Sequence, residues 1–122
     1  LKKRIELIEE CKPDIVVSIH QNSFTSSSCK GAQVFYYKQS EEGKKLAEKI
    51  QENLKNKLAD GNERKAKTDT SYYLLKNTIC PIAIVECGFM SNEEEAQLLN
   101  SPEYQKKLAA IIAEAIQQYF LL

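Results

Sequence analysis

The sequence has a single histidine in 122 residues, and it lacks several features that would identify a class of protein. It carries 17 basic and 17 acidic residues, so its formal net charge at pH 7 is zero. Phosphate contacts supply much of the affinity in nucleic-acid binding, and they require a clear excess of Lys and Arg. The balanced charge therefore argues against nucleic acid as the main partner.

Long apolar runs are also missing. No stretch approaches the roughly 18 apolar residues that a membrane-spanning helix needs, so the sequence predicts no membrane span. No secretory signal peptide is present. The chain opens instead on LKKRIELIEEC, which has the pattern of a helix inside a longer protein. No Gly-rich loop follows a predicted strand, which disfavours a nucleotide-binding domain.

The four cysteines show no metal-binding spacing. Cys11, Cys29, Cys80 and Cys87 contain no C-x-x-C pair, which argues against a zinc knuckle. Their spacing is not that of a disulfide framework either. We expect free thiols, most of them packed as small hydrophobic side chains.

The order of the apolar segments predicts one α/β domain. Runs at 15–20 and 82–88 are short and nearly continuous, which is typical of parallel strands covered on both faces. Further strands are predicted at 32–37 and 72–76, with a polar loop at 60–71. Amphipathic helices are predicted over 2–11, from Ser40 through Leu58, from Ser91 to near Asn100, and from Ser101 through Tyr119. This alternation favours a mainly parallel, twisted sheet flanked by helices.

Helix starts are predicted from capping residues. Ser40 reads as the N-cap of the second helix, and Ser91 with Glu94 as a capping box for the third. Ser101 precedes Pro102, a residue that suits the first position of a helix.

The two most apolar strands each end in an ionisable residue, His20 and Glu86. Ligands of parallel sheets bind at the carboxyl ends of the strands, so both side chains would reach one rim if these strands are neighbours. Imidazole is a common zinc ligand, and a nearby carboxylate can act as general base, which together describe a metal hydrolase. The alternative is that both are buried polar residues of the core. A catalytic zinc needs about three protein ligands. Cys29, Cys80 and Cys87 are available but have no supporting spacing, so the simplest source of further ligands is upstream of Leu1.

Two segments resemble a known family. SIHQNS at 18–23 and PIAIVECGFMSNEEEAQLL at 81–99 resemble the zinc-dependent N-acetylmuramoyl-L-alanine amidases, the cell-wall amidases of bacteria. GAQVFYY, KAKTDTSYYLLKNTICP and the last helix follow the order of that family, so the resemblance covers essentially the whole chain. SIHQNSF, RKAKT and YYLLKN are most similar to the spore-cortex amidases of the CwlD type.

The resemblance implies a fold, a reaction and roles. It implies the phosphorylase/hydrolase-like amidase fold and hydrolysis of the amide between N-acetylmuramic acid and L-alanine of the peptidoglycan stem peptide. It implies His20 as a zinc ligand and Glu86 as general base, with the remaining ligands, a His and a Glu, upstream of Leu1. Residues 1–122 would then be the C-terminal part of one catalytic domain without its N-terminal strands. Zinc binding, and with it activity, would then depend on those upstream ligands.

The resemblance also implies partners and a location. Peptidoglycan is the expected partner, some amidases of this family need a protein activator, and the location is the extracytoplasmic, cell-wall or spore-envelope side. A role in sporulation or germination follows from the subtype. The alternative is a non-catalytic peptidoglycan-binding or regulatory module of the same fold.

Four other positions carry narrower expectations. Asn22 and Ser23 either hold His20 in orientation or form a plain turn. Gly88 is expected to allow a close backbone approach or a positive φ. Arg64 either lies in a solvated, charged loop, which is favoured, or meets a carboxylate of the stem peptide.

Overall fold

The computed structural model describes residues 2–69, 75 and 80–122, and over these residues it confirms the α/β class. In this part of the chain, strands β1 (Val16–Asn22), β2 (Gln33–Tyr36), β3 (Lys67–Thr68) and β4 (Ile82–Phe89) form a sheet in the order β1-β4-β2-β3. β1 pairs with β4 in parallel, and so does β2 with β3. The predicted mainly parallel sheet is confirmed, although β2 runs antiparallel to β4.

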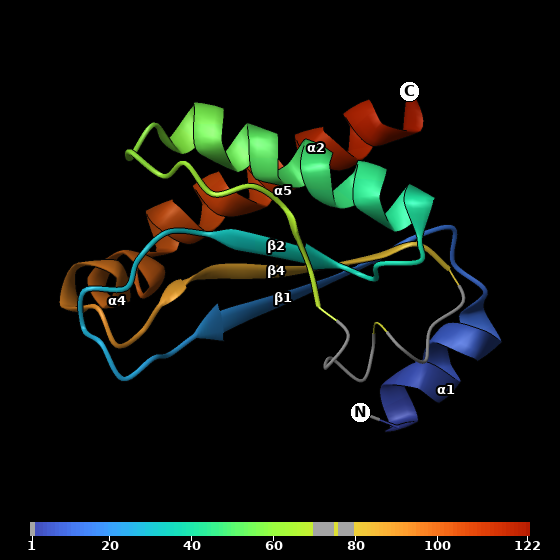
Figure 1. Cartoon of the computed structure of the whole chain (residues 1–122), viewed down its shortest axis with the longest axis horizontal. Helices are drawn as coiled ribbons and strands as arrows, with labels where there is room; N and C mark the ends of the chain where they lie inside the picture. Colours follow the sequence, from blue (N-terminus) through green and yellow to red (C-terminus); the bar gives the residue numbers. More distant parts are fainter. Residues whose placement is uncertain (1, 70–74, 76–79) are drawn as a thin grey trace.

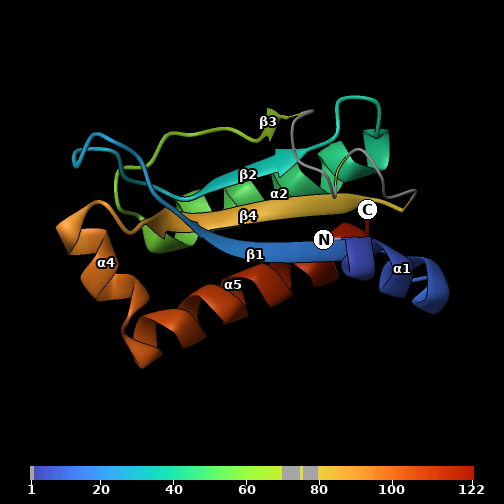
Figure 2. The same ribbon diagram turned by 90° about the horizontal axis from the view of Figure 1, so that it is seen from below.

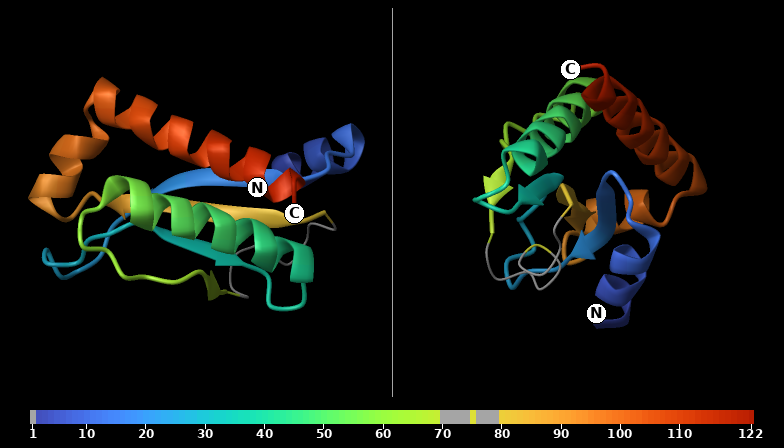
Figure 3. Two further views of the ribbon diagram at one scale, coloured as in Figure 1. Left: turned by 90° about the horizontal axis from the view of Figure 1, so that it is seen from above. Right: turned by 90° about the vertical axis from the view of Figure 1, so that its right-hand side faces the viewer.

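The helices cover both faces of the sheet. They are α1 (Lys2–Cys11), α2 (Glu41–Leu58), α4 (Glu93–Leu99) and α5 (Pro102–Phe120). α2 and α5 lie side by side over one face, and α1 lies on the opposite side of the sheet (Figures 1 and 3). Within the described ranges, no helix combines the length and the apolar character that crossing a membrane requires.

Alternating residues of β4 face two separate clusters of apolar side chains. Ala83 and Val85 pack in the main core with α2 and α5, whereas Ile82 and Ile84 pack with Ile5 of α1. Side chains of a strand alternate between faces with a period of two. Both faces are therefore covered, which explains why the sequence of β4 is almost uninterrupted apolar.

Two helix starts confirm the predicted caps. Ser40 Oγ accepts a hydrogen bond from the Gly43 N–H at 2.9 Å, and Ser101 Oγ accepts one from the Tyr104 N–H at 3.4 Å. Each hydroxyl satisfies a backbone donor that has no partner within its helix.

The predicted start of α4 is wrong by one residue. The N-cap is Asn92, whose Oδ1 accepts from the Glu95 N–H at 3.1 Å. Ser91 Oγ instead accepts from the Phe24 N–H, in the loop after β1. Asn and Ser cap helices about equally well, so capping preference alone does not choose between them.

Two further predictions concern the strand at 72–76 and the loop at 60–71. The strand predicted at 72–76 lies outside the described residues, except for Leu75, which is buried and has a helical backbone. β3 falls inside the predicted loop at 60–71. Its two residues pair with Phe35 and Tyr36 and are exposed, so no apolar pattern marks this strand.

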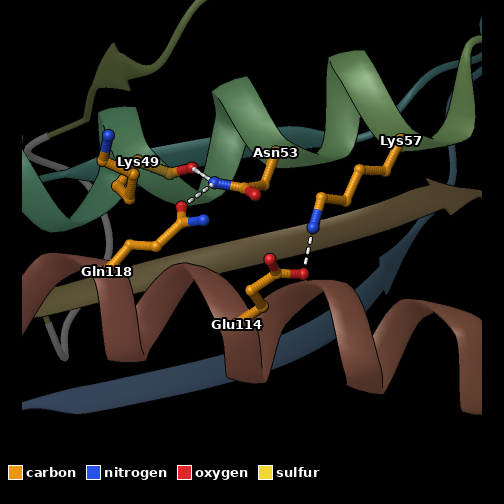
Figure 4. Close-up of polar contacts among 5 residues, drawn as sticks. All are labelled: Lys49, Asn53, Lys57, Glu114 and Gln118. Atoms are coloured by element: carbon orange, nitrogen blue, oxygen red, sulfur yellow. Dashed lines mark hydrogen bonds and ion pairs between the residues drawn. The ribbon is translucent and has the colours of Figure 1, made fainter.

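A polar contact joins α2 to α5. Asn53 Nδ2 donates to the Gln118 Oε1 at 2.9 Å and to the Lys49 carbonyl oxygen at 2.8 Å, and the Asn53 residue is only 6% exposed (Figure 4). One turn further along α2, Lys57 forms an ion pair with Glu114 at the surface (Figure 4). The same helix pair thus carries a partly buried and an exposed polar contact.

We expect Asn53→Ala to lower the free energy of unfolding by about 1 kcal/mol, because a buried hydrogen bond has a net value of that order. Lys57→Ala is the matched control and should cost less than about 0.5 kcal/mol, since solvent screens the exposed ion pair. Urea unfolding followed by circular dichroism measures both variants. Equal losses of unfolding free energy in the two variants would contradict the expected difference between the Asn53 hydrogen bond and the exposed ion pair.

Candidate functional site

His20 and Glu86 lie on neighbouring strands at the same level of the sheet. β1 and β4 run in the same direction, with β4 between β1 and β2 (Figure 2). Their parallel register pairs Val16 with Ile82 and His20 with Glu86. Residues paired in this way place their side chains on the same face. The structure therefore brings together, at the carboxyl ends of two strands, the two residues that the sequence singled out.

Glu86 is a buried acid in the middle of the sheet. It is 5% exposed and lies between His20 of β1 and Gln33 of β2 in the strand register. Its position in the alternation of β4 matches that of Ile82 and Ile84, so its side chain leaves the strand on the face toward α1. Burying a carboxylate opposes folding, and acids kept at such positions are often functional groups.

His20 is partly buried and is held by its own strand. Its Nε2 lies 2.8 Å from the Ser18 Oγ, two residues earlier on the same face. Such a contact fixes the plane of the ring and selects which nitrogen carries the proton, as partners of metal-binding histidines do. Ser18 was not among the residues predicted for the site, although its i, i−2 spacing from His20 on a strand was an available signal.

The residues predicted to orient His20 instead contact each other. The Ser23 N–H donates to Asn22 Oδ1 at 2.8 Å, a contact between adjacent residues. This contact does not involve His20 and does not by itself form a turn, so neither predicted alternative is confirmed by it.

The segments that follow β1 and β4 are bonded to each other. The Met90 N–H donates to the Asn22 carbonyl oxygen at 2.7 Å, and Asn92 Nδ2 donates to the Ser27 carbonyl oxygen at 2.9 Å. Together with the bond from Phe24 to Ser91, these contacts fix the serine-rich loop after His20 against the chain that follows Glu86.

A cavity of about 410 Å³ lies beside His20. It runs between β1 and α5, and its lining includes Ile19, Cys87, Leu108 and Ile112. The walls are mainly apolar, so this cavity is suited to apolar groups more than to an ion.

The described residues do not complete a metal site by themselves. Within residues 2–69, 75 and 80–122, no group of three or more His, Cys, Asp or Glu side chains is placed to hold a metal ion. His20 supplies one imidazole and Glu86 a neighbouring carboxylate, whereas a catalytic zinc takes about three protein ligands. The donor set therefore fits part of a zinc site.

The prediction of free thiols is confirmed, because all four cysteines are free. The prediction that most are packed as hydrophobic side chains holds for Cys87, which is buried, and is wrong for Cys11, which is exposed. Burial and, to a smaller extent, the charge of Glu86 raise the pKa of the Cys87 thiol to about 11. Cys87 is therefore a poor nucleophile despite its place beside Glu86.

We expect alkylation by iodoacetamide near pH 8 to modify Cys11 first and Cys87 last. The raised pKa lowers the thiolate fraction of Cys87 about a hundredfold below that of an ordinary cysteine, and burial slows access further. Peptide mass spectrometry over a time course measures both rates, and in denaturant the two should converge. Comparable rates in the native protein would contradict the burial of Cys87.

Comparison with known proteins identifies the family. Residues 1–118 match the family model described as N-acetylmuramoyl-L-alanine amidase. The chain belongs to the N-acetylmuramoyl-L-alanine amidase family, whose members are hydrolases of an amide bond.

The relatives support the resemblance to the CwlD type. The germination-specific N-acetylmuramoyl-L-alanine amidase of Bacillus subtilis (strain 168) is 41% identical over 120 residues, covering 98% of this chain and 50% of the relative. The LytC amidase of the same organism is 31% identical, covering 98% and 24%. The CwlD amidase from Clostridioides difficile, solved in complex with the GerS lipoprotein, superposes with a TM-score of 0.94 at 42% identity. That match covers 98% of this chain and 60% of CwlD, so this chain spans between about a quarter and three fifths of these relatives.

Proposed function

We propose that this chain carries the general base and one zinc ligand of an N-acetylmuramoyl-L-alanine amidase. The whole protein would hydrolyse the amide between N-acetylmuramic acid and the L-alanine of the peptidoglycan stem peptide. The pairing of His20 with Glu86 at the carboxyl ends of β1 and β4 is the observation that carries this proposal. Membership of the amidase family supports it.

Zinc is the metal that the resemblance implies, and His20 would hold it through a ring nitrogen. Bound zinc would lower the pKa of a coordinated water to about 7. The other ligands, a histidine and a glutamate, would come from outside residues 1–122, because the described residues supply one imidazole only. Residues 1–122 would then be the C-terminal part of a single catalytic domain.

Glu86 is suited to move protons in this reaction. As the water oxygen bonds to the lactyl carbonyl carbon, the Glu86 carboxylate would take the water proton. It would pass that proton to the nitrogen of L-alanine when the C–N bond breaks. General acid–base transfer of this kind contributes roughly 10²–10⁴-fold to a rate. The low exposure of Glu86 keeps its carboxylate away from competing bulk water.

The named relatives support a place at the cell wall. One is a germination-specific amidase, and the CwlD amidase was solved with the GerS lipoprotein. We propose peptidoglycan as the substrate, a location on the extracytoplasmic side at the cell wall or spore envelope, and a protein partner for the whole protein. Sporulation or germination would be the process.

The incomplete ligand set also supports a second candidate function. A module that binds peptidoglycan without cutting it would keep this fold and would need no complete metal site, and the described residues hold none. The two candidates differ in whether stem peptides are released.

We expect Glu86→Gln in the complete protein to lower stem-peptide release from purified peptidoglycan by about 10²-fold or more, because the amide cannot accept the water proton. Zinc content should not change. Glu93→Gln, an exposed change of the same kind on α4, is the control and should retain full activity. Retained cleavage in Glu86→Gln would remove Glu86 from this role. A wild-type protein that sediments with peptidoglycan but releases nothing would favour the binding module.

In the complete protein, we expect His20→Ala to lose bound zinc on dialysis, because the variant lacks one ligand. Elemental mass spectrometry measures the zinc content. Ser18→Ala should still bind zinc, but roughly 10–100-fold more weakly, since the ring loses the contact that orients it. Circular dichroism checks that both variants are folded. Full zinc content in His20→Ala would place the metal elsewhere.

A further inference from the structure

Glu95 is a second buried acid, and the chemistry above does not use it. It lies in the first turn of α4 and is 8% exposed. Its Oε1 accepts a hydrogen bond from the Phe89 N–H at 2.9 Å. The Gly31 N–H donates to both of its oxygens, at 3.1 and 3.0 Å. One carboxylate thus joins the end of β4 to the segment that leads into β2.

The glycine at position 88 allows the Glu95 carboxylate to lie close to the backbone of β4. A Cβ on Gly88 would lie 3.2 Å from the Glu95 Oε1, which is tighter than ordinary side-chain contacts. Gly88 therefore serves close packing, and the predicted alternative of a positive φ applies instead to Gly31, at +103°. Both glycines leave room for side chains that join these two segments.

Arg64 joins the same two segments from another direction. Its Nη2 donates to the Lys30 carbonyl oxygen at 3.1 Å, and its guanidinium carbon lies 5.6 Å from the centroid of the Phe89 ring. A guanidinium over an aromatic face is an attractive contact. The predicted reading of Arg64 as a merely solvated loop residue is therefore incomplete.

The hydrogen-bond ladder between β1 and β4 is irregular at the site. Its register shifts between His20 and Asn22, and Asn22 then aligns with Phe89. A shift of this kind disrupts the ladder locally and bends the strand. The ladder alone therefore fixes the ends of these strands less firmly than a regular one would. Contacts from outside the sheet therefore also help to fix the ends of these strands. One of them is the hydrogen bond from the Phe89 N–H to Glu95.

We propose that Glu95 is a positioning residue for amide hydrolysis. By accepting from Gly31 and Phe89, it sets the end of β4 and with it the place of the Glu86 carboxylate relative to His20. This inference rests on the proposed roles of Glu86 and His20. Small displacements of a reacting group lower the rate of the chemical step more than they lower substrate binding.

Glu95→Gln is the test variant. It keeps the size of the side chain and one acceptor oxygen, but its NH₂ cannot accept from a backbone N–H. In the complete protein, kcat for stem-peptide release should fall about tenfold or more, with KM changed by less than about twofold. Glu94→Gln is the matched control, because Glu94 is the exposed neighbour in the same turn, and it should leave both constants unchanged.

A readout without catalysis separates this inference from the proposed function. In the folded chain, we expect Glu95→Gln to speed hydrogen exchange at the Gly31 and Phe89 amides and to shift the ¹³C signal of the Glu86 carboxyl. Glu94→Gln should do neither. An unchanged Glu86 signal, or an unchanged kcat in an active protein, would overturn the positioning role. A wild-type protein that releases no stem peptide while the Glu86 signal still responds to Glu95→Gln would contradict the proposed function alone.

Discussion

Parallel hydrogen bonding between β1 and β4 determines where the candidate site lies. It aligns His20 with Glu86 and sends both strands toward the same rim. A slip of one residue would turn one of these side chains to the opposite face. The register is held by burial, because Val85 must reach the core under α2 and α5 while Ile84 must reach the cluster around α1. The same apolar packing that stabilises the domain thus places an imidazole beside a carboxylate.

Two buried acids close together in sequence have different environments. Glu95 accepts from the backbone N–H groups of Gly31 and Phe89, which compensates for its removal from water. Glu86 lies instead between His20 and Gln33 in the register of the central strand, where a hydrophobic residue would continue the pattern of β4. Glu95 thus joins two backbone segments beside the site, whereas the role that we propose for Glu86 is chemical.

Several features could be predicted from the sequence because they depend on local pattern. The apolar run at 82–88 indicated a buried strand, and every residue of β4 is buried. The same prediction for 15–20 is wrong, because β1 lies at the edge of the described sheet and its residues are partly buried or exposed. The rule for the carboxyl ends of parallel strands indicated His20 and Glu86 as neighbours, and their register agrees. The direction of β2 relative to β4 could not be predicted, because an apolar run does not indicate in which direction its strand runs in the sheet. β3 has no apolar pattern at all, since both of its residues are exposed.

The contacts of Glu95 and Ser18 were beyond sequence reasoning for a related reason. Residues 93–95 are three consecutive glutamates, and only the fold decides which one is buried. The alternation of a strand puts Ser18 and His20 on one face, but only the structure shows that their side chains are bonded.

Anomalous diffraction at the zinc edge, from crystals of the complete active protein, would test the central claim most directly. If β1 and β4 build the site, the anomalous peak will lie about 2.0–2.1 Å from a ring nitrogen of His20, with the Glu86 carboxylate within reach of a water on the metal. A zinc peak away from His20, with the histidine still bonded to Ser18 and Glu86 turned away from the metal, would contradict it.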